Sequence, residues 1–193
     1  MSPKTLFLLI AALFYLTTTI SAAAKPSSTF IKTSCATVDY PALCEKSLSP
    51  FAKTIKRSPA ELARTALAVT LKQSESTLAY LNKLKRLKGL KPRERAAIRD
   101  CLELVSISLD EISNSIKELK TYDRVRGQEF VRHMNHVLTW VSAVLTDETT
   151  CMDGFEGRAM EGRVKSSVRE HLTSVAQFTS NALDLVHNFA QKH

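Results

Sequence analysis

The chain contains little glycine and, after its first 24 residues, no long apolar run. Its five glycines fall in three clusters, so the long segments between them contain few residues that would interrupt a helix. No segment after residue 24 reaches the ~20 apolar residues that a membrane-spanning helix needs. No segment sustains the apolar–polar alternation of a strand. These absences argue against a membrane-embedded mature protein and against a β-sheet fold.

The sequence also lacks the motifs of common catalytic and cofactor sites. It has no glycine-rich phosphate loop and no G-x-S-x-G nucleophile motif. His133 and His136 lie one helical turn apart, but without the further ligands and base that a zinc motif such as H-E-x-x-H supplies. Carboxylates are scattered, with no distinct acid–base pair. We therefore predict that the chain is not an enzyme and has no catalytic residue, cofactor or metal.

The first 24 residues have the pattern of a secretory signal peptide. Lys4 precedes the apolar segment Leu6–Ile20, and Ser21–Ala24 offers small residues for cleavage. We predict a signal peptide over 1–24, secretion of the chain, and a single mature domain over 25–193. The mature part holds four cysteines, an even number that predicts two disulfides in an oxidising compartment. Spacing alone leaves three pairings open.

The long segments predict four antiparallel helices. Ser58–Glu61 is a capping box with proline at the first helical position. Beyond it, apolar residues recur at alternating spacings of four and three, which is typical of helices packed at small angles in a bundle. The predicted stripes are Ile98, Leu102, Val105, Leu109, Ile112, Ile116 and Leu119; Phe130, Met134, Val137, Val141 and Val144; and Val168, Leu172, Val175, Thr179, Ala182, Val186 and Phe189. We predict an all-α fold: an up-down-up-down four-helix bundle over 58–190, preceded by a helical hairpin over 25–57.

The predicted topology makes one disulfide pairing feasible. Cys101 precedes the second turn by about as many residues as Cys151 follows it, so the two return to nearly the same height in antiparallel helices. A bond between Cys35 and Cys44 is the simplest way to close the leading hairpin.

Basic residues crowd the first inter-helix turn. The formal net charge is +8, and in this topology the first and third turns share one end of the bundle. A secreted basic protein fits anionic polysaccharide or acidic lipid headgroups better than nucleic acid. We regard this basic end as a candidate anion-binding site, with a solvated rim as the alternative. Its candidate binding residues are Lys85, Arg86, Lys88, Lys91, Arg93 and Arg95. The other basic residues at this end are Lys83 and Arg99 near the first turn, and Arg158, Arg163 and Lys165 near the third.

Three separated motifs carry a family resemblance. They are DCLELVSISLDEI at Asp100–Ile112, WVSAVLTDETTCMDGF at Trp140–Phe155, and Y-P-x-L-C at Tyr40–Cys44. Together with all four cysteines they resemble plant pectin methylesterase inhibitors. The resemblance implies a four-helix bundle with an N-terminal hairpin, and disulfides that pair first with second and third with fourth. It also implies a protein of the apoplast or cell wall, monomeric when free. Such a protein forms a one-to-one complex with pectin methylesterase and covers the cleft that would hold pectin.

The resemblance also points to the residues that contact the enzyme. By position in the family motifs they are Glu103, Asp110, Thr150 and Asp153, each of which could equally be a solvated side chain or a helix cap. Asp123 in the second turn is a weaker candidate. Ile107 stands where other inhibitors carry an acid, so this part of the contact departs from the family.

Two alternative functions stay open. The same fold serves inhibitors of acid invertase, although the P-K-F motif expected of those proteins is absent from the mature part. A wall protein that binds acidic pectin through its basic end, and inhibits nothing, is the other alternative.

Overall fold

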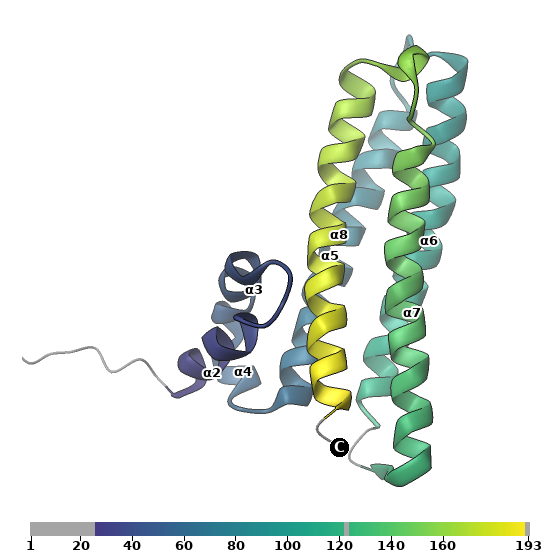
Figure 1. Ribbon diagram of the computed structural model, residues 1–193. Coiled ribbons are helices and arrows are strands. Elements are labelled where there is room, and N and C mark those ends of the chain that lie inside the picture. Colours follow the sequence, from purple (N-terminus) through teal and green to yellow (C-terminus); the bar gives the residue numbers. More distant parts are fainter. Residues whose placement is uncertain (1–25, 122–123, 192–193) are drawn as a thin grey trace, which may run out of the picture.

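The structure, a computed structural model, describes residues 26–121 and 124–191 (Figure 1). The predicted signal peptide and Asp123 lie outside these residues. Every regular element in the described part is a helix, which confirms the all-α prediction. None of the described helices has the length and apolar character needed to cross a membrane.

Four long helices form the bundle: α5 (Pro59–Lys85), α6 (Pro92–Leu119), α7 (Gly127–Asp153) and α8 (Arg163–Ala190). Consecutive helices run antiparallel, and α8 closes the bundle against α5 (Figure 1). The α5–α6 and α7–α8 turns therefore lie at one end, and the α6–α7 turn lies at the other. This is the predicted up-down-up-down topology.

The N-terminal hairpin lies beside the half of the bundle that is farther from the α5–α6 turn (Figure 1). Its Cys35–Cys44 disulfide joins two short helices, with their Cα atoms 5.5 Å apart. Two further helical turns continue the chain to the bundle. The four elements are α2 (Pro26–Cys35), α3 (Pro41–Leu48), η1 (Ser49–Phe51) and α4 (Ala52–Ile55).

A buried asparagine holds the hairpin to α8. The Asn181 side chain accepts a hydrogen bond from the Tyr40 backbone N–H at 2.9 Å and donates one to the Tyr40 carbonyl at 3.0 Å. Next to this pair, Asp184 accepts from the Asp39 N–H at 3.0 Å. One side chain thus pairs with both main-chain groups of Tyr40, the residue just before α3, whose carbonyl also accepts from the Cys44 N–H at 3.0 Å.

The helix starts follow the predicted capping chemistry only in part. Ser58 Oγ accepts from the Glu61 N–H at 3.2 Å, as expected at an N-cap. The reciprocal half of that box is absent, because the Glu61 carboxylate pairs with Arg64 instead. At the start of α6, the Glu94 carboxylate accepts from the Lys91 N–H at 2.8 Å.

The predicted core stripes of α7 and α8 are buried in full, but that of α6 is rotated. Leu102, Leu109 and Ile116 are only half-buried, and the positions one residue earlier are buried instead. Those positions hold Cys101, Ser108 and Ser115. Small side chains turned toward the bundle axis let neighbouring helices approach closely, while the larger ones cover the seams between helices.

The core consists of two apolar clusters with polar side chains between them. On α7, for example, Glu148 lies between Val144 of one cluster and Cys151 of the other. We call these buried residues the polar belt, and each is at most 2 % exposed. They are Thr70, Ser74, Thr77, Ser108, Glu148 and Thr179.

Candidate functional site

The α6–α7 face carries the residues predicted to contact a partner, and it is fixed at three levels. The Cys101–Cys151 disulfide, with its Cα atoms 4.9 Å apart, ties the two helices close to the α5–α6 turn, which confirms the predicted pairing. Midway, Ser108 Oγ donates to Asp147 at 3.1 Å. Near the α6–α7 turn, Glu118 Oε1 accepts from the Nδ1 atoms of two histidines.

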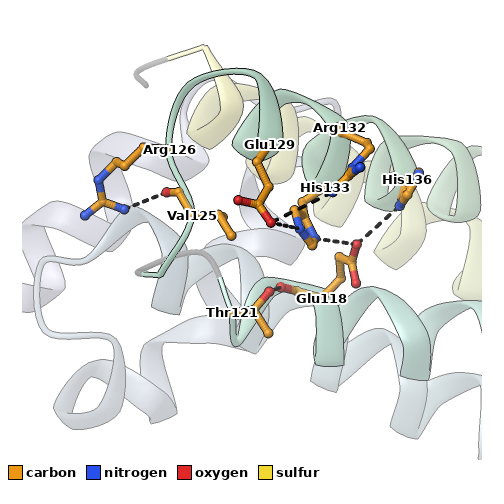
Figure 2. Close-up of polar contacts among 8 residues, drawn as sticks. All are labelled: Glu118, Thr121, Val125, Arg126, Glu129, Arg132, His133 and His136. Atoms are coloured by element: carbon orange, nitrogen blue, oxygen red, sulfur yellow. Dashed lines mark hydrogen bonds and ion pairs between the residues drawn. The ribbon is translucent and has the colours of Figure 1, made fainter.

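Figure 2 shows this last contact. Glu118 projects from α6 toward His133 and His136 of α7, at 2.6 and 3.3 Å. Glu129 lies 3.8 Å from the other ring nitrogen of His133. In the described part of the chain, no set of three or more histidine, cysteine or acidic side chains has a geometry that could hold a metal ion. The cluster is thus a link between two helices at the end of the bundle opposite the disulfide.

A surface hollow of about 510 Å³ lies beside the Cys101–Cys151 disulfide. Residues of α6 form one wall, and the end of α7 with the segment that follows it forms the other. Thr150 is exposed in that second wall, where its Oγ1 donates to the Thr146 carbonyl at 2.8 Å. At Gly154 an added Cβ would lie 3.3 Å from the Cys151 carbonyl oxygen, so the chain turns tightly here. The hollow is thus a concave surface whose two walls are joined by the Cys101–Cys151 disulfide.

The structure brings only one of the four predicted contact residues into the hollow. Thr150 lines it, whereas Glu103, Asp110 and Asp153 do not. Glu103 and Asp110 are exposed along α6 with Ile107 between them, and Asp153 is exposed at the last residue of α7. Ile107 is 46 % exposed, one of the few large apolar side chains left open in the described residues. The α6 stripe is therefore acidic at two positions and apolar between them.

Sequence reasoning missed a second acidic pair on this face. Burial, and then the neighbouring Asp147 carboxylate, raise the pKa of Glu111 above its ordinary value. One carboxylate oxygen of Glu111 is buried without a hydrogen-bond partner. Two carboxylates from adjacent helices thus lie close together, and the Ser108 hydroxyl, by donating to Asp147, partly offsets their mutual repulsion.

Glu148, which follows Asp147 on α7, is a buried acid in the polar belt. It is 2 % exposed, and its Oε1 accepts from Thr179 Oγ1 at 2.9 Å. Burial raises its pKa to about 8, and Asp147 adds to the effect. The spacing of Val141, Val144, Glu148 and Cys151 continues the apolar stripe, and this signal in the sequence could have identified it.

The six predicted first-turn basic residues are all exposed at the disulfide-bearing end of the bundle. Lys91 Nζ donates to the Ala159 carbonyl at 2.9 Å, which joins the first turn to the third. Arg93 lines the hollow beside the disulfide, while Lys88 and Lys91 line a different pocket between the two turns. The basic end therefore adjoins the hollow but is not the same site.

Comparisons with known proteins identify the family. Residues 29–185 match the family described as plant invertase/pectin methylesterase inhibitor. Among similar proteins, the "21 kDa protein" of Daucus carota is 53 % identical over 90 % of each chain. Pectinesterase inhibitor 9 of Arabidopsis thaliana is 44 % identical over 98 % of this chain and 95 % of its own. Pectinesterase inhibitor 11 of the same plant is 42 % identical, over 98 % and 96 %.

A solved structure supports the fold. A mutant form of a pectin methylesterase inhibitor from Arabidopsis superposes with a TM-score of 0.64 at 23 % identity, covering 81 % of this chain and 95 % of that one. The match over residues 29–185 is to an inhibitor family, and the two similar Arabidopsis proteins are named as pectinesterase inhibitors, so the prediction that the chain is not an enzyme is confirmed. The two disulfides, the bundle and these matches lead to one conclusion: the chain belongs to the plant invertase/pectin methylesterase inhibitor family.

Proposed function

We propose that the protein inhibits a pectin methylesterase by forming a one-to-one complex in which the α6–α7 face covers the enzyme's pectin-binding cleft. The observation that carries the proposal is the rigid construction of that face. A disulfide and side-chain contacts between α6 and α7 hold it at three levels. A surface that is already ordered loses little conformational entropy on binding. The names of two close relatives, pectinesterase inhibitors 9 and 11, favour this enzyme over invertase.

In this proposal Glu103, Asp110, Thr150 and Asp153 contact the enzyme. Glu103 and Asp110 form no salt bridge with a described residue, unlike Asp100, which pairs with Arg99, so they are available to cationic or hydrogen-bonding groups of a partner. Ile107 contributes an apolar contact between them where other family members are expected to have a charge. We expect that difference to affect which enzyme isoform is bound most tightly.

The first test fills the hollow. Thr150→Trp places an indole where the partner would lie, so we expect roughly tenfold or greater weakening of inhibition, in the range typical for a central contact. The matched control is Thr54→Trp, an exposed threonine on the hairpin. Circular dichroism verifies that both variants fold. A folded Thr150→Trp protein that inhibits as strongly as the parent would contradict this placement.

A second test addresses charge. The Glu103→Lys and Asp110→Lys variants should each weaken inhibition, whereas Glu75→Lys, which reverses an exposed acid on α5, should not. Assays of acid invertase with the same preparations examine the alternative target. Inhibition of invertase alone would overturn the proposal, as would a complex whose mass is not that of one inhibitor with one enzyme.

We also propose that residues 1–24 direct secretion and that the free protein is a monomer in the apoplast or cell wall. Two disulfides and no free cysteine among the described residues favour an oxidising compartment. Expression of the full chain in plant cells, followed by N-terminal sequencing of protein from the wall fluid, tests this. Retention of residues 1–24 in the exported protein would contradict it.

A further inference from the structure

A pocket of about 640 Å³ lies between the α5–α6 and α7–α8 turns, at the basic end of the bundle. It is lined by residues near the end of α5, by 87–91 of the first turn with Glu94 of α6, and by the end of the third turn with the first residues of α8. Four of its lining side chains are cationic: Lys83, Lys88, Lys91 and Arg163. Only two of these belong to the basic set predicted from the sequence, so the folded turns have assembled a different group of cations.

The cations of this pocket are largely unneutralised. Lys83, Lys88 and Arg163 form no ion pair with a described residue. Both acids in the lining are engaged: the Glu94 carboxylate accepts from the Lys91 N–H, and Glu161 pairs with Lys165 at 3.0 Å. Neighbouring exposed arginines and lysines of the first turn add to the positive potential.

The pocket also offers apolar surface. Leu87 is 50 % exposed at its edge, and Leu90 and Val164 contribute to the lining. The Tyr80 ring stacks on His171 with centroids 3.7 Å apart, and its hydroxyl bonds to Ser167, so the inner wall is held by α8. The combination of separated cations with apolar patches fits a ligand that has both carboxylates and carbon–hydrogen faces.

Size limits the class of ligand further. The volume falls within the roughly 300–1,000 Å³ typical of sites for organic molecules, and is far larger than a single inorganic anion requires. We propose that this pocket binds a short stretch of an acidic polysaccharide, with the uronate carboxylates on Lys83, Lys88 and Arg163 and the sugar faces against Leu87. Such a site would hold the inhibitor on an anionic matrix without using the α6–α7 face.

Binding is tested directly with the purified protein and short galacturonan oligomers, free of methyl ester, by isothermal titration calorimetry. We expect saturable binding that weakens as salt is raised. The Lys88→Glu/Arg163→Glu double variant should bind roughly tenfold or more weakly, because two attractive charges become repulsive. The control, Lys72→Glu/Lys117→Glu, makes the same change in net charge on exposed parts of α5 and α6 and should bind as the parent does.

The ligand class has its own controls. The parent protein should bind fully methyl-esterified oligomers no more tightly than the Lys88→Glu/Arg163→Glu variant binds ester-free oligomers. Equal losses in the two double variants would show that only net charge matters and would overturn the site. Equal binding of esterified or sulfated oligomers would overturn the assignment to uronates, and no binding by the parent would overturn both. No enzyme is present, so the outcome does not depend on inhibition.

Discussion

Replacing Glu148 with glutamine should remove most of the loss of stability that the protein suffers as pH rises. The side chain is 2 % exposed in the polar belt, and Thr179 donates a hydrogen bond to it. Glutamine has nearly the same shape and can accept the same hydrogen bond, but it cannot ionise. The variant therefore removes a titration and leaves the packing in place.

The sign of the effect follows from the direction of the shift. Burial raises the pKa of Glu148 in the folded protein from 4.5 to about 8. Between these values the folded chain keeps a proton that the unfolded chain has lost, so the free energy of unfolding falls as pH rises. This contribution to the free energy of unfolding is present in full below pH 4.5 and is lost by about pH 8. Since one pKa unit corresponds to ~1.4 kcal/mol, the loss from this group is on the order of 4 kcal/mol by pH 8.

Other acids contribute in the same direction. Burial also raises the pKa values of Glu111 and Asp184, although both side chains are more accessible than Glu148. A residual slope is therefore expected in the variant. The difference between parent and Glu148→Gln isolates the contribution of the buried acid.

Urea unfolding followed by circular dichroism, with the disulfides intact, measures this difference between about pH 5 and about pH 8. At the acid end the two proteins should agree within ~1 kcal/mol, the scale of one hydrogen bond. Toward the alkaline end Glu148→Gln should be the more stable protein. Glu75→Gln, at an exposed position of α5, should keep the parent slope. An unchanged slope in Glu148→Gln, or a parent whose stability rises with pH, would refute the reasoning.

Three further changes test other parts of the fold. Replacing Cys101 and Cys151 together by serine should lower the free energy of unfolding by ~4 kcal/mol, because the unfolded chain regains the freedom of a long loop; an equal urea midpoint would contradict this. Ser58→Ala should cost ~1 kcal/mol through loss of the α5 N-cap, measured by thermal unfolding. Asn181→Ala leaves the backbone N–H of Tyr40 without a partner and leaves its carbonyl with the Cys44 N–H alone, so amide hydrogen exchange should accelerate in α3 but not in α6. Uniform acceleration would show that the hairpin is not a separate unit.

The regular part of the fold could be predicted because α7 and α8 place apolar side chains at core spacing with little ambiguity. The height argument for Cys101 and Cys151 needed only the rise of a helix and a short turn. On α6, however, two rows of suitable residues lie side by side. The sequence pattern favoured the larger side chains, and burial selected Cys101, Ser108 and Ser115. Serine is buried at little cost here because, for instance, Ser115 Oγ donates to the Glu111 carbonyl at 2.9 Å.

The candidate sites depended more on turn conformation. The pocket between the first and third turns requires Gly89 with φ +82° and Gly162 with φ +143°, values that L side chains rarely adopt. The sequence identifies the glycines but not which cations the turned chain brings together. The sequence placed Lys83 and Arg163 at this end of the bundle, but neither was among the six predicted anion-binding residues. Likewise, core spacing marks Glu148 as a candidate buried acid, but it does not reveal that Thr179 of α8 is its hydrogen-bond partner.

The polar belt also determines how the four helices are aligned lengthwise. In a bundle with a uniformly apolar core, one helix can slide by a heptad, ~10 Å, and still bury an apolar stripe. Here the Cys101–Cys151 disulfide holds α7 to α6, and a slide of α8 past α7 would move Thr179 away from Glu148 and set the Glu148 carboxyl group against aliphatic side chains of a neighbouring cluster. Glu148→Leu should therefore yield a protein that melts at higher temperature yet in which α8 samples several axial alignments relative to α7, detectable as duplicated or broadened amide resonances of α8.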